Sequence, residues 1–267
     1  MFISDWIECF ERRVPPQLQE SWDHTGRQFG RFDRPLTGIV LALDLTEKAL
    51  QMADGCGANL ILTHHPVLFD AVHFLDERVA LQDWVMQAIE SGVAVYSSHT
   101  ALDIVDGGVN DVLAERAGLQ DVLPLRERPA DDPLIGYAQS LIGTWGRHDP
   151  VSLEVYAREL KAAFATESVV YYGDPTAEIL TVGCLGGGGM EAVADCKRLG
   201  LDVLLTSDAR YHEAQDAVRS GVNVVDLGHF ASEFPVLERV AAWSKEWAPD
   251  VAVNVVDNGE EGLRHLV

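Results

Sequence analysis

The sequence is poor in basic residues. Lys and Arg number 20 against 42 Asp and Glu, only four of the basic residues are lysines, and the formal net charge is −22. A surface with this balance repels phosphate backbones and anionic lipids. We therefore expect neither a nucleic-acid partner nor a membrane partner, although the charge still leaves room for a locally basic pocket that takes a small anion.

Cysteine frameworks, long apolar runs and a leader pattern are also lacking. The four cysteines, at positions 9, 56, 184 and 196, form no CxxC pair, which is typical of small core residues. No apolar stretch approaches the ~20 residues of a membrane span. The first 13 residues, MFISDWIECFERR, carry acids where a signal peptide needs a basic segment and then an apolar run. These absences predict a reduced, cytoplasmic protein.

The composition that remains is that of a globular protein. The 267 residues are 47% hydrophobic and 23% charged, which excludes a disordered chain. A chain of this length forms one large unit or two lobes.

Strand-like runs alternate with helical patterns in the first half of the chain. This rhythm predicts a parallel sheet with helices on both faces. The predicted strands are Ile39–Leu45, ANLILT (58–63) and VAVYSS (93–98), and the predicted helices are TEKALQMADGCG (46–57), with Thr46 as its cap, and LQDWVMQAIESG (81–92).

The same rhythm returns in the second half. The predicted strands there are Ile179–Leu185, LDVLLT (201–206) and VNVVDL (222–227), and the predicted helices cover 152–164, 190–200 and 212–221. GANLILT at 57 matches GLDVLLT at 200, and SGVAV at 91 matches SGVNV at 220. We interpret these matches as a weak internal duplication, and the alternative is that all α/β units look alike.

The duplication predicts two similar α/β lobes with mostly parallel sheets. Residues 120–150 are rich in proline and charge, which is typical of a connection between lobes. We expect a single unit over 1–267, with a first lobe of approximately 1–125 plus 222–267 and a second lobe of 126–221.

Metal-type side chains follow three of the predicted strands. Open parallel sheets bind ligands beyond the carboxyl ends of their strands. The residues at these ends are His64 and His65, His99 and Asp103, and His229 and Glu233. Their clustering favours a metal site. The alternative is that the histidines cap helices and fill hydrogen-bond networks.

The spacing of these residues suggests two ions. Successive residues of an extended chain point in opposite directions, so His64 and His65 would serve different ions. His229 and Glu233 are four residues apart and share one face if this segment opens a helix, and a carboxylate placed there can bridge two ions. Asp103 would supply a terminal oxygen. Two ions ~3.5–4 Å apart with a shared water are typical of hydrolytic enzymes.

Several segments together resemble one family. They are SWDHTGRQFG (21–30), THHPVLF (63–69), SHTALDIVDGGVNDVLAERAGL (98–119), LTSDARYHEAQDA (205–217) and GHFASE (228–233). In this order they are similar to the Nif-three-like (NGG-one interacting factor three) family, also labelled GTP cyclohydrolase I type 2 homologues. The resemblance covers nearly the whole chain.

The resemblance implies a two-lobed α/β fold with a dinuclear metal centre in the cleft between the lobes. It also implies a ring-shaped homohexamer whose metal sites face an internal cavity. The implied metal ligands are His64, His65, Asp103, His229 and Glu233, with Glu233 as the bridge. His99 matches a position near the centre, where we expect a supporting role or proton transfer.

The chain departs from the family pattern at two positions and carries weaker signals at two others. His24 stands where the family usually has asparagine, and Ser207 replaces a glycine. Gly186–Gly189 could cradle a phosphate with its amides, although a tight turn explains it as well. His212 is a candidate catalytic residue, and a helix start would look the same.

Two functions follow from this pattern. The first is a metal-dependent hydrolase, cyclohydrolase-like or phosphoesterase-like, that acts on a small nucleotide-like or phosphorylated substrate, with His99 or His212 moving protons. The second is a non-catalytic metal-binding protein with a regulatory, storage or metallochaperone role. Imidazole and carboxylate ligands suit zinc, manganese, iron, cobalt or nickel, so the two divalent ions per chain stay unidentified.

Overall fold

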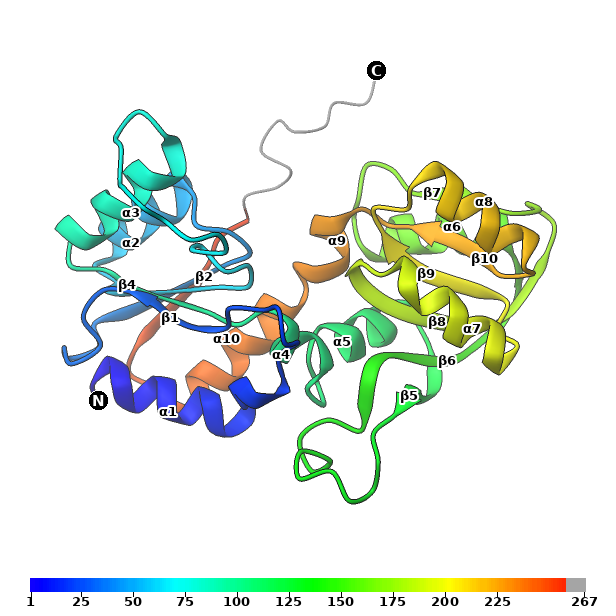
Figure 1. The fold of residues 1–267 in the computed structure, drawn as a ribbon, viewed down its shortest axis with the longest axis horizontal. Coiled ribbons are helices and arrows are strands. Elements are labelled where there is room, and N and C mark those ends of the chain that lie inside the picture. The colour runs from blue at the N-terminus through cyan, green and yellow to red at the C-terminus, as the bar shows by residue number, and fades with distance from the viewer. Residues whose placement is uncertain (258–267) are drawn as a thin grey trace. The chain divides into compact units, whose positions relative to one another are not determined.

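The computed structural model describes residues 1–257 and divides into two compact units (Figure 1). The first unit contains residues 1–102 and 236–257, and the second unit contains residues 103–235. The chain passes into the second unit within helix α4 (Thr100–Ile104) and returns just before α10 (Val236–Trp247). The sequence places the lobe boundaries near 125 and 222 instead, because it assigns the proline-rich stretch to a connection.

The first unit is built on a five-stranded sheet of order β1-β4-β3-β2-β11. All neighbouring strands are parallel except β1 and β4. The three central strands are buried along their whole length, which explains their continuous apolar sequence. The strands are β1 (Gly26–Phe29), β2 (Gly38–Ala42), β3 (Leu60–Thr63), β4 (Ala94–Ser97) and β11 (Ala252–Val255).

Helices cover both faces of this sheet (Figure 1). Helices α2 (Glu47–Cys56) and α3 (Ala80–Glu90) share a core with one face. On the other face, α1 (Ile3–Arg13) packs with α10, and Phe10 meets Tyr96 of β4 edge-on with ring centroids 5.9 Å apart. The Thr46 side chain accepts the N–H of Ala49 and caps α2, as the sequence predicts.

The second unit is built on a six-stranded sheet of order β5-β6-β8-β9-β10-β7. Strands β8, β9 and β10 are parallel, whereas the other three pairings are antiparallel. The sheet is therefore mixed rather than mostly parallel. The strands are β5 (Gln120–Glu127), β6 (Ser140–Ser152), β7 (Val170–Tyr172), β8 (Glu178–Gly188), β9 (Val203–Ser207) and β10 (Asn223–Asp226).

The stretch 120–150 is part of this sheet and not a linker. Strand β5 and most of β6 lie within it, and β6 pairs with both β5 and β8. The sequence analysis missed these strands because they mix proline and charged residues with apolar ones, and β5, which is largely exposed, carries little apolar signal.

Helices also cover both faces of the second sheet. The helices are α5 (Val109–Arg116), α6 (Leu153–Ala163), α7 (Val193–Leu199), α8 (Tyr211–Arg219) and α9 (His229–Glu233). Apolar residues of α5 and α6 share one core with β8 and β9, and α7 contributes to a second core. The predicted α/β class, with two sheets flanked by helices, is confirmed.

The two matched segments share one backbone detail. Gly57 ends α2 at φ 69° and ψ 25°, and Gly200 ends α7 at φ 70° and ψ 34°. Both are left-handed helix ends, a conformation that favours glycine. Each matched segment therefore starts from the same helix stop and runs into an equivalent parallel strand, β3 or β9.

Candidate metal-binding site

Three histidines of the first unit form a cluster past the carboxyl ends of β3 and β4. His64 and His65 follow β3, and His99 follows β4. One possible ligand atom from each lies within 4.8 Å of the other two. The ring centroids are 4.9 Å apart for His64 and His65, and 5.3 Å and 5.6 Å from each of these to His99.

His64 and His65 do not follow the alternation expected of a strand. Both lie past Thr63, where β3 has ended, so the opposite-facing rule for extended residues no longer applies to them. Their rings converge on His99 instead. The structure therefore places His99 among the candidate ligands, beyond the supporting role that the sequence predicts.

An oxygen atom accepts a hydrogen bond from the Nδ1 atom of each of the three rings. His64 Nδ1 donates to the carbonyl of Ser98 over 2.9 Å, and His65 Nδ1 donates to Asp44 Oδ1 over 2.8 Å. His99 Nδ1 lies 3.0 Å from Asp23 Oδ1. Because such oxygens only accept, Nδ1 carries the proton and the lone pair of each neutral ring is on Nε2. This is how proteins orient metal-binding histidines.

Asp23 is buried and holds the segment that carries His99. Its carboxylate accepts the N–H and the hydroxyl of Thr100 over 3.0 and 2.6 Å, and the N–H of His24 over 2.7 Å. Burial alone raises the pKa of Asp23, but the hydrogen bonds from His99, Thr100 and His24 outweigh it and hold the pKa well below its usual value. Asp23 therefore stays a carboxylate beside His99.

The second unit contributes a histidine and a carboxylate. His229 and Glu233 are four residues apart on α9, and His229 Nε2 lies 3.1 Å from Glu233 Oε2. His229 Nδ1 lies 2.6 Å from Asp208 Oδ2. With the Nδ1 proton directed to Asp208, the Nε2 lone pair faces the Glu233 carboxylate. A lone pair and a carboxylate oxygen repel each other at this distance unless a proton or a metal ion lies between them.

Glu233 is buried against two glycines of β8. An added Cβ at Gly187, where φ is +64°, would lie 2.4 Å from Glu233 Oε1. One at Gly186 would lie 2.6 Å from Val109 Cγ1. Gly187 N also donates to Ser232 Oγ on α9 over 3.0 Å. The glycine run is thus the end of a strand that α9 approaches closely, and neither a tight turn nor a phosphate cradle explains it.

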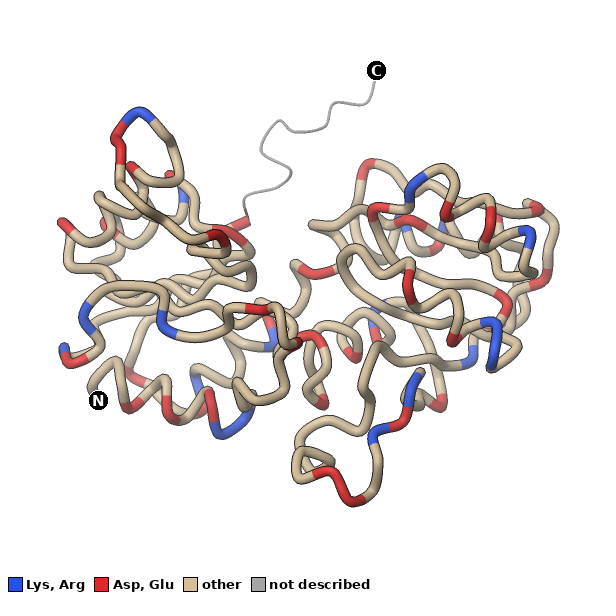
Figure 2. Tube along the Cα trace, viewed as in Figure 1, with Lys and Arg blue, Asp and Glu red and all other residues tan. Residues whose placement is uncertain are grey.

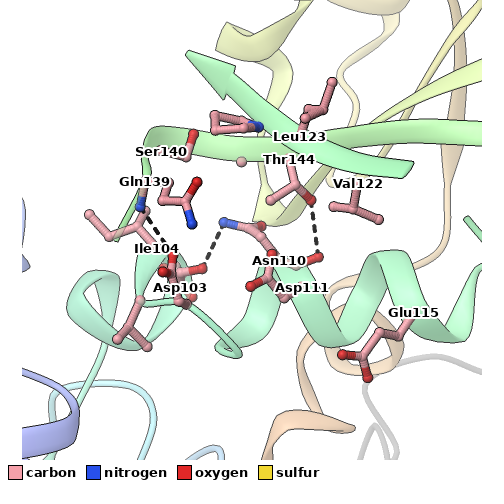
Figure 3. A pocket seen from close by; sticks show the side chains of 14 residues that line it. Asp103, Ile104, Asn110, Asp111, Glu115, Val122, Leu123, Gln139, Ser140 and Thr144 are labelled. Atoms are coloured by element: carbon pink, nitrogen blue, oxygen red, sulfur yellow. Dashed lines mark hydrogen bonds between the residues drawn. The ribbon is translucent and has the colours of Figure 1, made fainter. Parts of the chain in front are cut away.

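Asp103 lies at the margin of a pocket in the second unit (Figure 3). The pocket has a volume of about 320 Å³ and lies beside α5, β5 and β6. The Asp103 carbonyl accepts the side-chain N–H of Asn110 over 2.8 Å. Three more carboxylates, Asp106, Asp111 and Glu115, line the same pocket. Asp103 therefore lies in an acidic setting that favours a cation.

The remaining predicted positions are less closely tied to these groups. His212 is exposed at the start of α8, where its ring meets Tyr211 at 5.1 Å. His24 is exposed and meets Phe69 edge-on at 5.5 Å. Ser207 is fully buried at the end of β9. His212 is thus a surface residue.

Three carboxylates that orient histidines were missed by the sequence analysis. Asp23, Asp44 and Asp208 hold His99, His65 and His229 respectively. Asp44 lies two residues past the end of β2, and Asp208 lies one residue past the end of β9. An acid at the carboxyl end of a parallel strand is therefore the signal that could have identified these two.

Acidic residues outnumber basic ones along both units (Figure 2). This distribution attracts cations, including divalent metal ions. Among residues 1–257, no helix combines the length and the apolar character that crossing a membrane requires.

Known proteins match the chain over nearly its whole length. The model of the Duf34/NIF3 (NGG1p interacting factor 3) family matches residues 1–259. A GTP cyclohydrolase 1 type 2 homolog of Clostridium perfringens is 33% identical over 247 residues, 92% of each chain. One from a Nostoc species is 31% identical over 90% of each chain.

Solved structures share the fold. A Bacillus cereus protein related to NIF3 has a TM-score of 0.91 at 20% identity, covering 100% of this chain and 99% of its own. A Staphylococcus aureus hypothetical protein has a TM-score of 0.90 at 24% identity with the same coverage. The family match extends over all the histidine and carboxylate segments described above. The chain therefore belongs to the Duf34/NIF3 family.

Proposed function

We propose that the protein binds two divalent metal ions per chain and is a metal-dependent hydrolase. The proposed ligands are His64, His65, Asp103, His229 and Glu233, with Glu233 as a ligand to both ions. The proposed substrate is a small nucleotide-like or phosphorylated molecule, in keeping with the cyclohydrolase-homolog name of the relatives.

The observation that carries this proposal is the His229–Glu233 pair. Its Nε2 and Oε2 atoms are 3.1 Å apart, and Asp208 orients the imidazole from its other side. Metal bonds of ~2.0–2.2 Å place neighbouring ligand atoms of one ion about 3 Å apart. The donor set and its spacing thus fit a divalent ion.

The histidine cluster of the first unit provides independent support. Three imidazoles with oxygen partners on Nδ1 present Nε2 as the ligand atom, as in known metal sites. Histidines that merely completed a hydrogen-bond network would have no reason to bring three possible ligand atoms to within 4.8 Å of one another.

In this function the side chains position the site and move protons. When bound, divalent ions polarise a carbonyl or phosphoryl oxygen and activate water for attack. His99 is held by the ionised Asp23, which favours the tautomer with a lone pair on Nε2 and stabilises the ring when it takes up a proton. Asp44 and Asp208 fix the orientation of His65 and His229.

Metal analysis followed by a substrate screen on one sample tests the proposal. The protein is purified without added metal, its metal content is measured, and the apo form is titrated. We expect about two ions per chain and turnover of a nucleotide or phosphoester. A maximum near one ion contradicts the dinuclear site, and two ions without turnover favour the non-catalytic alternative.

The homohexamer stays a prediction from the family resemblance. Sedimentation velocity of the metal-loaded protein measures the mass of the assembly. A species of six chains supports the prediction, and a monomer contradicts it.

A further inference from the structure

Two exposed aromatic residues lie beside the histidine cluster of the first unit. Trp22 is 54% exposed and Phe69 is 45% exposed. Their ring centroids are 6.3 Å apart, and the Trp22 ring meets His99 edge-on at 5.8 Å. Phe69 is only four residues past His65. Both aromatic residues therefore belong to segments that carry the cluster.

The backbone beneath Trp22 is held firmly on both sides. The next residue, Asp23, is buried and bound to the N–H and hydroxyl of Thr100. Glu20 N donates to the Thr100 hydroxyl over 2.9 Å, and His99 N donates to the Thr25 hydroxyl over 3.1 Å. An exposed ring on a fixed backbone loses little conformational freedom when a ligand covers it.

Phe69 is anchored in a similar way. Leu68 N donates to Gln28 Oε1 over 3.0 Å, and Val67 is buried in the core of the first unit. The exposed imidazole of His24 meets the Phe69 ring edge-on. The exposed Trp22 and Phe69 rings thus each lie next to a polar imidazole at a steep angle, 73° for His99 and 69° for His24. This setting suits a flat ligand that is apolar on its faces and polar at its rim.

We propose that Trp22 and Phe69 form a stacking surface for a planar heteroaromatic ring of the substrate, such as a nucleobase. This inference rests on the proposed function, since it describes the substrate of the same site. It separates base-containing substrates from non-aromatic phosphorylated ones. Trp22 determines specificity by binding the ring, while the reacting part of the substrate extends toward the histidines.

A pair of probes that differ by one base tests the proposal. Binding of adenosine 5′-monophosphate and ribose 5-phosphate to the metal-loaded protein is measured by equilibrium dialysis. Their charge is nearly the same, so repulsion by the acidic surface cancels in the comparison. Stacking on one aromatic side chain predicts that adenosine 5′-monophosphate binds about 10-fold more tightly.

Variants assign this preference to the stacking surface. We expect Trp22→Ala to lower the affinity for adenosine 5′-monophosphate about 10-fold and to leave ribose 5-phosphate unchanged, whereas Trp22→Phe keeps most of the affinity. Phe74→Ala is the control, because Phe74 is 68% exposed in the same unit. Among the described residues, its ring contacts none of the three histidines. This control should bind both probes as the wild type does.

Three results would overturn the inference. They are equal affinity for the two probes, no binding of adenosine 5′-monophosphate at millimolar concentration, and a loss of assembly mass in Trp22→Ala, which would assign the aromatic pair to contact with a second copy. Metal content measured on the same samples separates this failure from that of the proposed function. Two bound ions without base preference refute only the stacking surface, and base preference without bound metal refutes only the hydrolase.

Discussion

The ends of β3 and β4 in the first unit and of β9 and β10 in the second follow one backbone plan but carry different side chains. Ser98 N donates to the Thr63 carbonyl over 2.9 Å, and Leu227 N donates to the Thr206 carbonyl over the same distance. In the first unit, two histidines follow Thr63. In the second, a serine and Asp208 follow Thr206.

This difference shows that matching positions at strand ends can carry side chains with different roles. His65 is a candidate ligand, whereas Asp208 at the matching position orients the candidate ligand His229. The carboxylate of the second unit comes instead from a short helix, where Glu233 packs against Gly187. The strand ends thus provide equivalent backbone positions, and the side chain at each position determines whether it is a candidate metal ligand or orients one.

The largest effect on metal binding should come from substitution of Glu233, the proposed bridging carboxylate of the second unit. Glu233→Gln keeps the size but removes the charge that offsets two adjacent cations, so both ions should be lost and any turnover should fall by orders of magnitude. Asp103→Asn, a terminal ligand, should deplete mainly one ion. Metal stoichiometry of the two variants, measured side by side, distinguishes them. Retention of two tightly bound ions by Glu233→Gln shows that the bridge is assigned wrongly.

Replacing one histidine-orienting carboxylate in each unit compares how much each contributes to metal affinity. Asp44→Asn and Asp208→Asn should each weaken metal binding ~10–100-fold, because the ring orientation of His65 or His229 is no longer fixed. Competition with a metal chelator measures the affinity. Asp54→Asn, on the exposed surface of α2, is the control and should bind metal as the wild type does. Equal affinity of all three variants contradicts the supporting role.

Gly187→Ala tests the close contact between β8 and Glu233 of α9. The added Cβ would lie 2.4 Å from Glu233 Oε1 at a φ of +64°. Gly200→Ala is the matched control, because φ is +70° there and nothing lies within 4 Å. Backbone strain alone should cost about 1–2 kcal/mol of unfolding free energy in both. Only Gly187→Ala should cost more and weaken metal binding, as urea unfolding and metal titration would show. Identical losses would exclude the contact with Glu233.

A smaller effect is expected at an ion pair of the second unit that lies outside the candidate ligands. Burial raises the pKa of Asp195, but its bonds to Arg126 at 2.6 Å and Arg198 at 3.0 Å outweigh this and lower the pKa below 3.8. Because the pKa of Asp195 is lower in the folded protein than in the unfolded chain, the ionised carboxylate stabilises the fold at pH values above the unfolded pKa. This contribution is lost as the pH falls through the folded pKa.

Asp195→Asn should therefore cost about 1–3 kcal/mol of unfolding free energy at pH 7, and the cost should shrink below about pH 4. Urea unfolding at several pH values measures it. The exposed pair of Asp216 and Arg219, at 3.6 Å, provides the control, and Asp216→Asn should change stability by less than about 0.5 kcal/mol. If the loss of unfolding free energy in Asp195→Asn does not depend on pH, then packing rather than charge accounts for the stabilising effect of Asp195.

The smallest effect on metal is expected at His212, a candidate from sequence alone. Its ring is exposed on α8 beside Tyr211, so His212→Ala should leave the metal content unchanged. Turnover should fall only if the protein is an enzyme in which His212 moves a proton. Metal analysis and a rate measurement on one sample decide this. Loss of metal in this variant would make His212 a ligand and extend the site beyond the strand ends compared above.

Most of the regular structure was predictable from local pattern. The apolar runs that became β2, β3, β4, β9 and β10 are buried strands of parallel ladders, and Thr46 caps α2 as predicted. Strands β5 and β6 were not predictable, because their long-range pairing compensates for a polar, proline-containing sequence. Local propensity yields to long-range strand pairing in this part of the sheet.

The sequence by itself determined the strand ends, the candidate ligands and the family. Residue spacing and the order of the histidine and carboxylate motifs carry that information directly. Only the tertiary structure brought His99 to His64 and His65, attached Asp23, Asp44 and Asp208 to their histidines, and set Gly187 against Glu233. These contacts join residues from separate segments of the chain, and the distance between two such atoms depends on how whole strands and helices pack rather than on any local pattern.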